Sequence, residues 1–161
     1  MIVIADTSPL NYLLLLDRVE LLRQLYGRVL IPEAVRQELC DPLAPKAVSA
    51  WAERLPDWVE VRAVDLTTES LAELDAGERS AILLAEQLAG PTLLLMDDAK
   101  GRIEAKRRGI RTTGTLGILR AASVERILRL DVVLPHLRQT NFFLGEDLYK
   151  SLLEEERERY L

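Results

Sequence analysis

The stretch Met1-Ile2-Val3-Ile4-Ala5-Asp6-Thr7-Ser8 decides the fold class. Its apolar residues run without alternation, as in a strand that is buried on both faces of a parallel sheet. The run ends on the carboxylate of Asp6, and in open parallel sheets ligands bind beyond the carboxyl ends of the strands. Ser8 and Pro9 then predict a helix, with Ser8 as its N-cap and Pro9 at its first position. We therefore expect Asp6 to lie at a functional crevice.

The composition is typical of a globular domain with an aliphatic core. The 161 residues are 48% hydrophobic and 29% charged, but only 5% aromatic. We expect one domain over 1–161, with a core of about 1–120 and C-terminal helices over about 121–161. The single Cys40 excludes an internal disulfide and a cysteine-based metal cluster. No signal segment or membrane-spanning run is present, so we expect a cytoplasmic protein without a membrane partner.

The net charge of −5 argues against a protein that binds nucleic acid through a broadly basic surface. Two divalent cations held by converging acids would change this balance to about −1. The acidic composition therefore does not exclude a polyanionic substrate, but it argues against tight binding of such a substrate without metal.

Short apolar runs alternate with amphipathic helical patterns along the chain. After the first strand, we expect strands at residues 28–31, 58–64, 92–96 and 110–112. The run at 58–64 alternates apolar and polar residues, which is typical of an edge strand. Strands that alternate with helices predict a three-layer α/β/α domain with a mostly parallel sheet.

The predicted strand at 92–96 also ends on carboxylates, Asp97 and Asp98. If this strand neighbours the first, these acids face Asp6 across the crevice. Adjacent carboxylates in a low dielectric repel each other unless a cation lies between them, which favours a metal site. The alternative is that one of the pair only caps the helix that begins at Ala99.

Two glutamates are more ambiguous. Glu78 lies on the apolar stripe of its helix, where a bare glutamate is costly unless it is paired or metal-bound. The alternative is a capping box formed with Asp75, and the spacing fits both interpretations. Glu38 borders an apolar stripe and, judged alone, is a surface glutamate.

A basic cluster directly follows the aspartate pair. It is either a solvated helix face or a contact for the phosphate backbone, and comprises Lys100, Arg102, Lys106, Arg107 and Arg108. His136 is the single histidine, so catalysis by a histidine pair is excluded. The sequence contains neither a glycine-rich phosphate loop nor a Ser-His-Asp set.

With these residues identified, the chain resembles PIN-domain proteins, in particular the bacterial and archaeal branch of predicted nucleic-acid-binding proteins. The matching segments are VIADTSPL at 3–10, IPEAVRQEL at 31–39, DAGERSA at 75–81, LMDDAKGR at 95–102 and the segment 113–117. The resemblance implies a five-stranded parallel sheet in the order 3-2-1-4-5, with metal-binding acids around its carboxyl edge. Carried over by position, it implies four catalytic acids: Asp6, Glu38, Glu78 and Asp98.

The resemblance further implies a ribonuclease that cleaves RNA phosphodiester bonds. Carboxylates without histidine or cysteine ligands suit hard cations, so Mg²⁺ or Mn²⁺ is expected. The implied metal ligands are Asp6, Glu78 and the aspartate pair, in which Asp98 is favoured as the ligand and Asp97 is either a ligand or a neighbouring cap or support. Glu38 ligates or orients the attacking water. The expected substrate contacts are Thr7, Ser8, Lys100 and Arg102.

Partners also follow from the resemblance. The family includes toxins of toxin–antitoxin pairs, so a small antitoxin protein is an implied partner beside RNA. The apolar run at 13–16 and the late helices offer more apolar surface than one core needs, which predicts a homo-oligomer such as a dimer.

Two alternative functions were weighed. A PIN-like domain that binds RNA or protein without cutting has no need of four converging acids. A phospho-receiver or acid-phosphatase type would place its aspartates differently, because their pairs follow the first strand, where this chain has Asp6-Thr7-Ser8.

Overall fold

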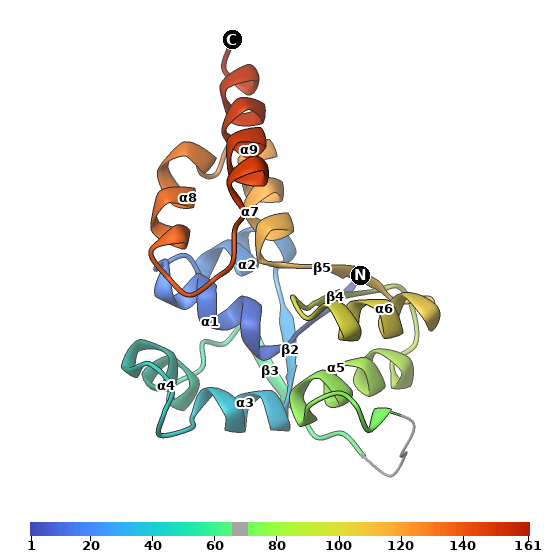
Figure 1. The fold of residues 1–161 in the computed structure, drawn as a ribbon. Coiled ribbons are helices and arrows are strands. Elements are labelled where there is room, and N and C mark those ends of the chain that lie inside the picture. The colour runs from blue at the N-terminus through green and yellow to red at the C-terminus, as the bar shows by residue number, and fades with distance from the viewer. Residues whose placement is uncertain (66–70) are drawn as a thin grey trace.

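The computed structural model describes residues 1–65 and 71–161 and contains a five-stranded parallel sheet in the order β3-β2-β1-β4-β5 (Figure 1). Each neighbouring pair of strands is parallel. The strands are β1 (Ile2–Ala5), β2 (Val29–Pro32), β3 (Val59–Arg62), β4 (Thr92–Leu95) and β5 (Arg111–Thr113). The predicted α/β/α fold and its strand order are therefore confirmed.

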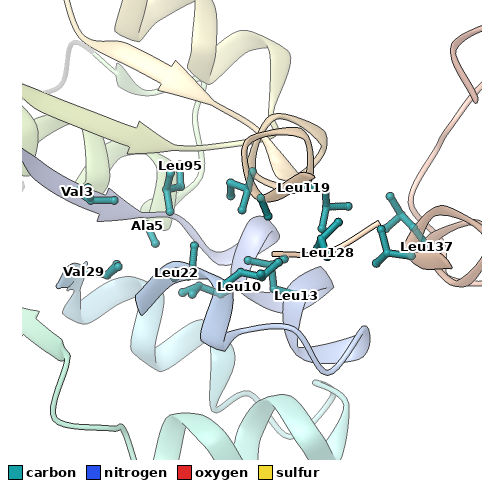
Figure 2. Packing of buried hydrophobic residues seen from close by; sticks show 14 of the residues in the cluster. Val3, Ala5, Leu10, Leu13, Leu22, Val29, Leu95, Leu119, Leu128 and Leu137 are labelled. Carbon is teal, nitrogen blue, oxygen red and sulfur yellow. The ribbon is translucent and has the colours of Figure 1, made fainter. Parts of the chain in front are cut away.

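The strand side chains alternate between two hydrophobic cores, one on each face of the sheet. On the first face, Val3 and Ala5 pack with Leu10, Leu22 and Leu119 from the covering helices (Figure 2). The helices that contribute to this core are α1 (Thr7–Leu15), α2 (Glu20–Tyr26), α3 (Glu33–Leu39), α4 (Lys46–Glu53), α7 (Thr115–Val124), α8 (Leu130–Arg138) and α9 (Glu146–Arg159).

The opposite face of the sheet is covered by α5 (Ala76–Gln87) and α6 (Ala99–Arg107). Here Ile4, Leu94 and Met96 are fully buried. In Figure 1 these two helices lie to the right of the sheet, away from α1 and α2. Because both faces are covered, β1 is apolar throughout and β4 is apolar after Thr92, as the runs in the sequence predicted.

The start of α1 differs from the prediction. We expected Ser8 to be the N-cap, but α1 begins at Thr7 and Asp6 occupies the N-cap position. The Asp6 backbone N–H donates to the Leu95 carbonyl at 2.9 Å, so the chain leaves the sheet only after Asp6. Ser8 consequently lies in the first helical turn, and its hydroxyl group contacts Asp97 instead of capping the helix.

The apolar run of α1 is used mainly inside the chain. Leu13 is fully buried, Leu14 and Leu16 pack against the core, and Leu15 alone in this run is 39% exposed. The late helices do expose apolar side chains, among them Val124, Val132 and Leu148. Self-association therefore stays a prediction. Within the described ranges, the molecule has no helix with the length and hydropathy needed to span a bilayer.

Candidate acidic site at the carboxyl edge of the sheet

The site lies where the strand order reverses. β1 pairs with β2 on one side and with β4 on the other, so the connections leave it in opposite directions and open a crevice at its carboxyl end. A cavity of about 780 Å³ occupies this position. Its lining includes seven acidic residues and, among the described residues, no lysine, arginine or histidine; the acids are Asp6, Glu38, Asp41, Asp75, Glu78, Asp97 and Asp98.

Asp6 is the most buried of these acids, with 5% of its surface exposed. Burial raises the pKa of Asp6 to about 8, and the negative charges of Asp75, Glu78 and Glu38 add to the effect. The Thr7 backbone N–H opposes the shift in pKa by hydrogen bonding to the carboxylate. The carboxylate of Asp6 is therefore costly to ionise unless a cation compensates its charge.

Glu38 is brought to Asp6 by the packing of α3 against α5. A Cβ atom on Gly77 would lie 3.0 Å from both Asp6 Oδ1 and Glu38 Oε2, so these two carboxylates flank the same glycine. Thr7 Oγ1 donates a hydrogen bond to Glu38 Oε2 at 2.9 Å. Burial and the charge of Asp75 raise the pKa of Glu38, and the Thr7 hydrogen bond partly offsets them.

Glu78 satisfies both interpretations of its sequence pattern. The capping box is formed, because Glu78 N donates to Asp75 Oδ1 at 2.8 Å and Asp75 N donates to Glu78 Oε2 at 3.3 Å. Glu78 also lines the cavity. Burial, together with the hydrogen bond and charge of Asp75 and the charge of Asp98, raises the pKa of Glu78 to about 7.

Asp75 and Asp41 also line the site, although the sequence did not predict either of them there. Asp75 was interpreted only as a helix cap, although it lines the cavity and its charge acts on Asp6, Glu38 and Glu78. The sequence did contain a signal for Asp75, because it precedes the first turn of α5, which carries the candidate Glu78. Asp41 follows α3 in a proline-rich turn, and no pattern in the sequence distinguishes it.

The two adjacent aspartates have different hydrogen-bond partners. Asp97 accepts hydrogen bonds from Ser8 Oγ at 2.8 Å, from Thr115 N at 2.7 Å and from Thr115 Oγ1 at 2.7 Å. Asp97 thus links the first turn of α1 to the first turn of α7. Asp98 is the N-cap of α6 and accepts one hydrogen bond, from Gly101 N at 2.8 Å. The member of the pair that caps the helix is therefore Asp98.

Thr7 and Ser8 were predicted to contact the substrate. Both line the cavity, and both hydroxyl groups donate their single hydrogen to a carboxylate, Glu38 and Asp97 respectively. In this arrangement their oxygens accept hydrogen bonds, as from a water molecule, rather than donate to a phosphate oxygen. Their contact with the substrate stays a prediction.

The basic cluster divides into two parts. Arg107 and Arg108 form ion pairs with Glu104, and Arg108 also pairs with Glu86, so these arginines belong to a solvated, ion-paired helix face. Arg102 lines a groove next to the acidic cavity, and Lys100 is exposed on α6 without lining either hollow. The predicted substrate contacts of these last two side chains remain predictions.

The donor chemistry of the cavity suits a hard divalent cation, because it offers carboxylate oxygens together with hydroxyl oxygens. Asp6 is the most buried acid of this set, and its pKa is raised chiefly by burial and further by the charges of Asp75, Glu78 and Glu38. Within residues 1–65 and 71–161, however, no three acidic, histidine or cysteine side chains have the arrangement of a completed metal site. Mg²⁺ usually keeps several waters and needs only one or two carboxylates, so these residues fit such an ion.

Fold and site together define a doubly wound α/β protein with an acidic crevice at its switch point. The family DUF3368, described as a PIN domain, matches residues 2–158, and the chain belongs to this family. The resemblance found in the sequence is thus confirmed. PIN domains are in general nucleases that use divalent metal ions, and this chain has their nuclease-like fold.

A solved structure supports the same fold. The chain is similar to a PilT N-terminus domain protein from the hyperthermophilic archaeon Sulfolobus solfataricus P2, with 19% sequence identity and a TM-score of 0.57. The similarity covers 76% of this chain and 93% of the archaeal protein. No curated protein matches the chain.

Proposed function

We propose that this protein is a metal-dependent endoribonuclease that hydrolyses RNA phosphodiester bonds with Mg²⁺ or Mn²⁺. The observation that carries the proposal is the convergence of Asp6, Glu38, Glu78 and Asp98 on one cavity without a compensating cationic side chain among the described residues. Such a group of carboxylates is unfavourable unless protons or metal ions neutralise it. Membership of a family of nucleases supports the metal interpretation over a purely structural one.

The residues have separate roles in this proposal. Asp6, Glu78 and Asp98 hold the cation, and Asp97 fixes the walls of the site through Ser8 and Thr115. A bound divalent cation supplies an activated water and stabilises charge on the phosphate. Glu38 would orient the attacking water. The oxygen of this water bonds to phosphorus while the ester P–O bond breaks, and one proton of the water is transferred through Glu38 to the leaving oxygen.

The activity is tested with a panel of structured and single-stranded RNAs in Mn²⁺, Mg²⁺ or EDTA. Wild-type protein should cut RNA only with metal, and Asp6→Asn should reduce cutting more than about a hundredfold, because it removes the central ligand. At about pH 5 in EDTA, its melting temperature should stay near that of the wild type. Retained activity in Asp6→Asn contradicts the assignment.

A non-catalytic PIN-like binding domain is the second candidate, favoured by the lack of a completed ligand set among the described residues. A thermal shift discriminates the two. Stabilisation of the wild type, but not of Asp6→Asn, by Mn²⁺ supports the nuclease. RNA binding that is unaffected by metal, without cleavage, supports the binding domain.

The proposal includes action as the toxin of a toxin–antitoxin pair. Production of the wild type, but not of Asp6→Asn, should then slow growth of a bacterial host. Copurification with a small protein encoded next to it supports this role, whereas a solitary, harmless gene contradicts it.

A further inference from the structure

Two surface grooves continue the acidic cavity. The first groove, of about 600 Å³, shares Asp97 with the cavity as a lining residue. The second groove, of about 490 Å³, shares Arg102 with the first and follows β5, the edge strand of the sheet. The three hollows therefore adjoin one another in a row from the carboxyl edge of β1 to the outer edge of β5.

The sign of the charge reverses along this row. The second groove is lined by Arg102, Lys106 and Arg111 without an acidic residue among those described. In the described part of the chain none of these three cations forms an ion pair, whereas Arg120 of the first groove is bound to Glu155 through two hydrogen bonds of 3.1 and 2.6 Å. Unpaired cations beside an acidic cavity are complementary to a polyanion that has one phosphate at the acids and others at the cations.

The first groove also has an aromatic wall. Phe143 is 90% exposed there, while the adjacent Phe142 packs edge-on against Tyr12 at a ring distance of 5.0 Å. An exposed phenyl ring has unfavourable contact with water, and a ring next to cations offers a stacking surface for a nucleobase. Bases within a duplex have both faces covered, so this ring selects an unpaired base.

We propose that this row of grooves binds single-stranded RNA, with Arg102, Lys106 and Arg111 at phosphates and Phe143 stacked on a base. The inference rests on the proposed function, since it takes the acidic cavity as the place where the strand is cut. It adds Arg111 and Phe143 to the substrate contacts, although no sequence pattern singled them out.

The test is binding of a short fluorescent single-stranded RNA of mixed sequence to Glu38→Gln protein in Mg²⁺, measured by anisotropy over a range of salt. The Glu38→Gln background prevents cutting because it removes the residue that orients the attacking water, and it keeps the proposed metal ligands Asp6, Glu78 and Asp98. Lys106→Gln/Arg111→Gln is compared with Arg18→Gln/Arg28→Gln, which removes two exposed cations that line none of the three hollows. Both double variants change the net charge equally.

The Lys106→Gln/Arg111→Gln variant should bind about tenfold more weakly and reduce the salt slope by about 1.4, or about 0.7 for each lost phosphate contact. The control should stay within about twofold of the background. Phe143→Leu should weaken binding about fivefold or more without changing the salt slope, whereas Phe143→Tyr, which keeps the ring, should bind as the background does.

Four results would each overturn the proposal. The two double variants could lose affinity equally, or Phe143→Leu could bind RNA as the background does. The protein could also bind duplex RNA with equal affinity, or bind no RNA at all. Cleavage of the same RNA is measured separately with protein that carries none of these substitutions. If this protein cuts no RNA in Mn²⁺ while the groove variants lose RNA binding, the proposed nuclease activity is contradicted and the proposed RNA-binding groove is supported. If this protein cuts RNA while the groove variants bind RNA normally, the proposed RNA-binding groove is contradicted and the proposed nuclease activity is supported.

Discussion

Individual acids of the cavity differ in how their charge is stabilised. Asp97 accepts hydrogen bonds from Ser8 and from the Thr115 backbone and hydroxyl group. Asp6 lies nearly buried among other acids, and its pKa is raised to about 8. Asp97 is thus suited to hold the structure together, and Asp6 to bind a cation.

Asparagine substitutions at the aspartate pair separate these roles. Asp97→Asn should lower the free energy of unfolding by about 1.5–3 kcal/mol, because it loses charge-assisted hydrogen bonds. Asp98→Asn should cost about 0.5 kcal/mol or less, because Asn caps a helix as well as Asp. Asp98→Asn should instead weaken Mn²⁺ binding more than about tenfold. Urea unfolding and metal titration check both; the reverse pattern would make Asp97 the ligand.

Gly77 offers a test in which stability and metal affinity change in opposite directions. The new methyl group of Gly77→Ala would lie 3.0 Å from oxygens of Asp6 and Glu38 and push them apart. Alanine also favours the helix by up to about 1 kcal/mol. We expect an unchanged or higher melting temperature and about tenfold weaker Mn²⁺ binding. Gly145→Ala, with no contact under 3.9 Å, is the control and should bind metal normally.

The stability of the metal-free protein should fall as the pH rises. The pKa of Asp6 is raised from 3.8 to about 8 in the folded chain, so its contribution to stability is complete below about pH 4 and is lost as the pH rises through about 8. Glu78, whose pKa is about 7, acts in the same direction. Between about pH 5 and 8, wild type in EDTA should lose at least about 1 kcal/mol more than Asp6→Asn. Parallel urea-unfolding curves for both proteins would disprove this.

The sequence predicted part of the site at this scale. Asp6 and the aspartate pair follow buried strands, and a strand end is a position that periodicity locates. Glu78 and Glu38 were assigned only through the resemblance, because a capping box and a helix border are also common on surfaces. Asp75 was not predicted because it occupies a capping position. A capping pattern in the sequence indicates a hydrogen bond to the backbone, but it does not show that the same side chain also lines a cavity.

At the scale of the elements, α6 shows why a charge run has no single interpretation. Its C-terminal arginines, Arg107 and Arg108, pair with glutamates, while Arg102 and Lys106 face the grooves. The sequence places all of these cations within nine residues of one helix, but the partner Glu86 belongs to α5. Glu104 of α6 pairs with both Arg107 and Arg108, so only the second partner of Arg108, Glu86, depends on the packing of α5 against α6.

The docking of α9 depends on a buried polar cluster. Glu156 is fully buried, and its Oε2 lies 3.2 Å from Arg159 Nη1 and accepts a hydrogen bond from Ser123 of α7. Arg159→Gln should therefore lower the free energy of unfolding by about 2 kcal/mol or more, because it leaves a buried carboxylate without its cation. Adding Glu156→Gln should restore most of the loss. Additive losses in urea unfolding would show that the two side chains are not coupled.

Boundaries of elements were predicted less well than their existence. Each strand expected from the sequence is present within two or three residues of its predicted limits. The start of α1 was wrong because Asp6 pairs with Leu95 of β4 before the helix begins. Local capping preferences cannot predict this hydrogen bond, because Asp6 and Leu95 are far apart in the sequence.

For the whole molecule, the two apolar runs that became β1 and β4 explain why the fold class was predictable. Strands that are apolar on both faces need helices on both sides, and the right-handed crossover rule then leaves few arrangements. The strand order came from the resemblance, because periodicity does not reveal which strands are neighbours. The oligomeric state depends on side-chain exposure, as at Leu15, which only the packed structure provides.

Calorimetric titration of Mn²⁺ into wild type and Asp6→Asn near neutral pH is the most direct test of the metal site. Because the pKa values of Asp6 and Glu78 are raised to about 8 and about 7, an ion that binds there must displace protons. Titrations in two buffers of different ionisation enthalpy should give release of about one proton by wild type. Asp6→Asn should bind little or no metal. Absence of binding by wild type, or equal binding by both proteins, would contradict the proposal that this cavity is a divalent-metal site.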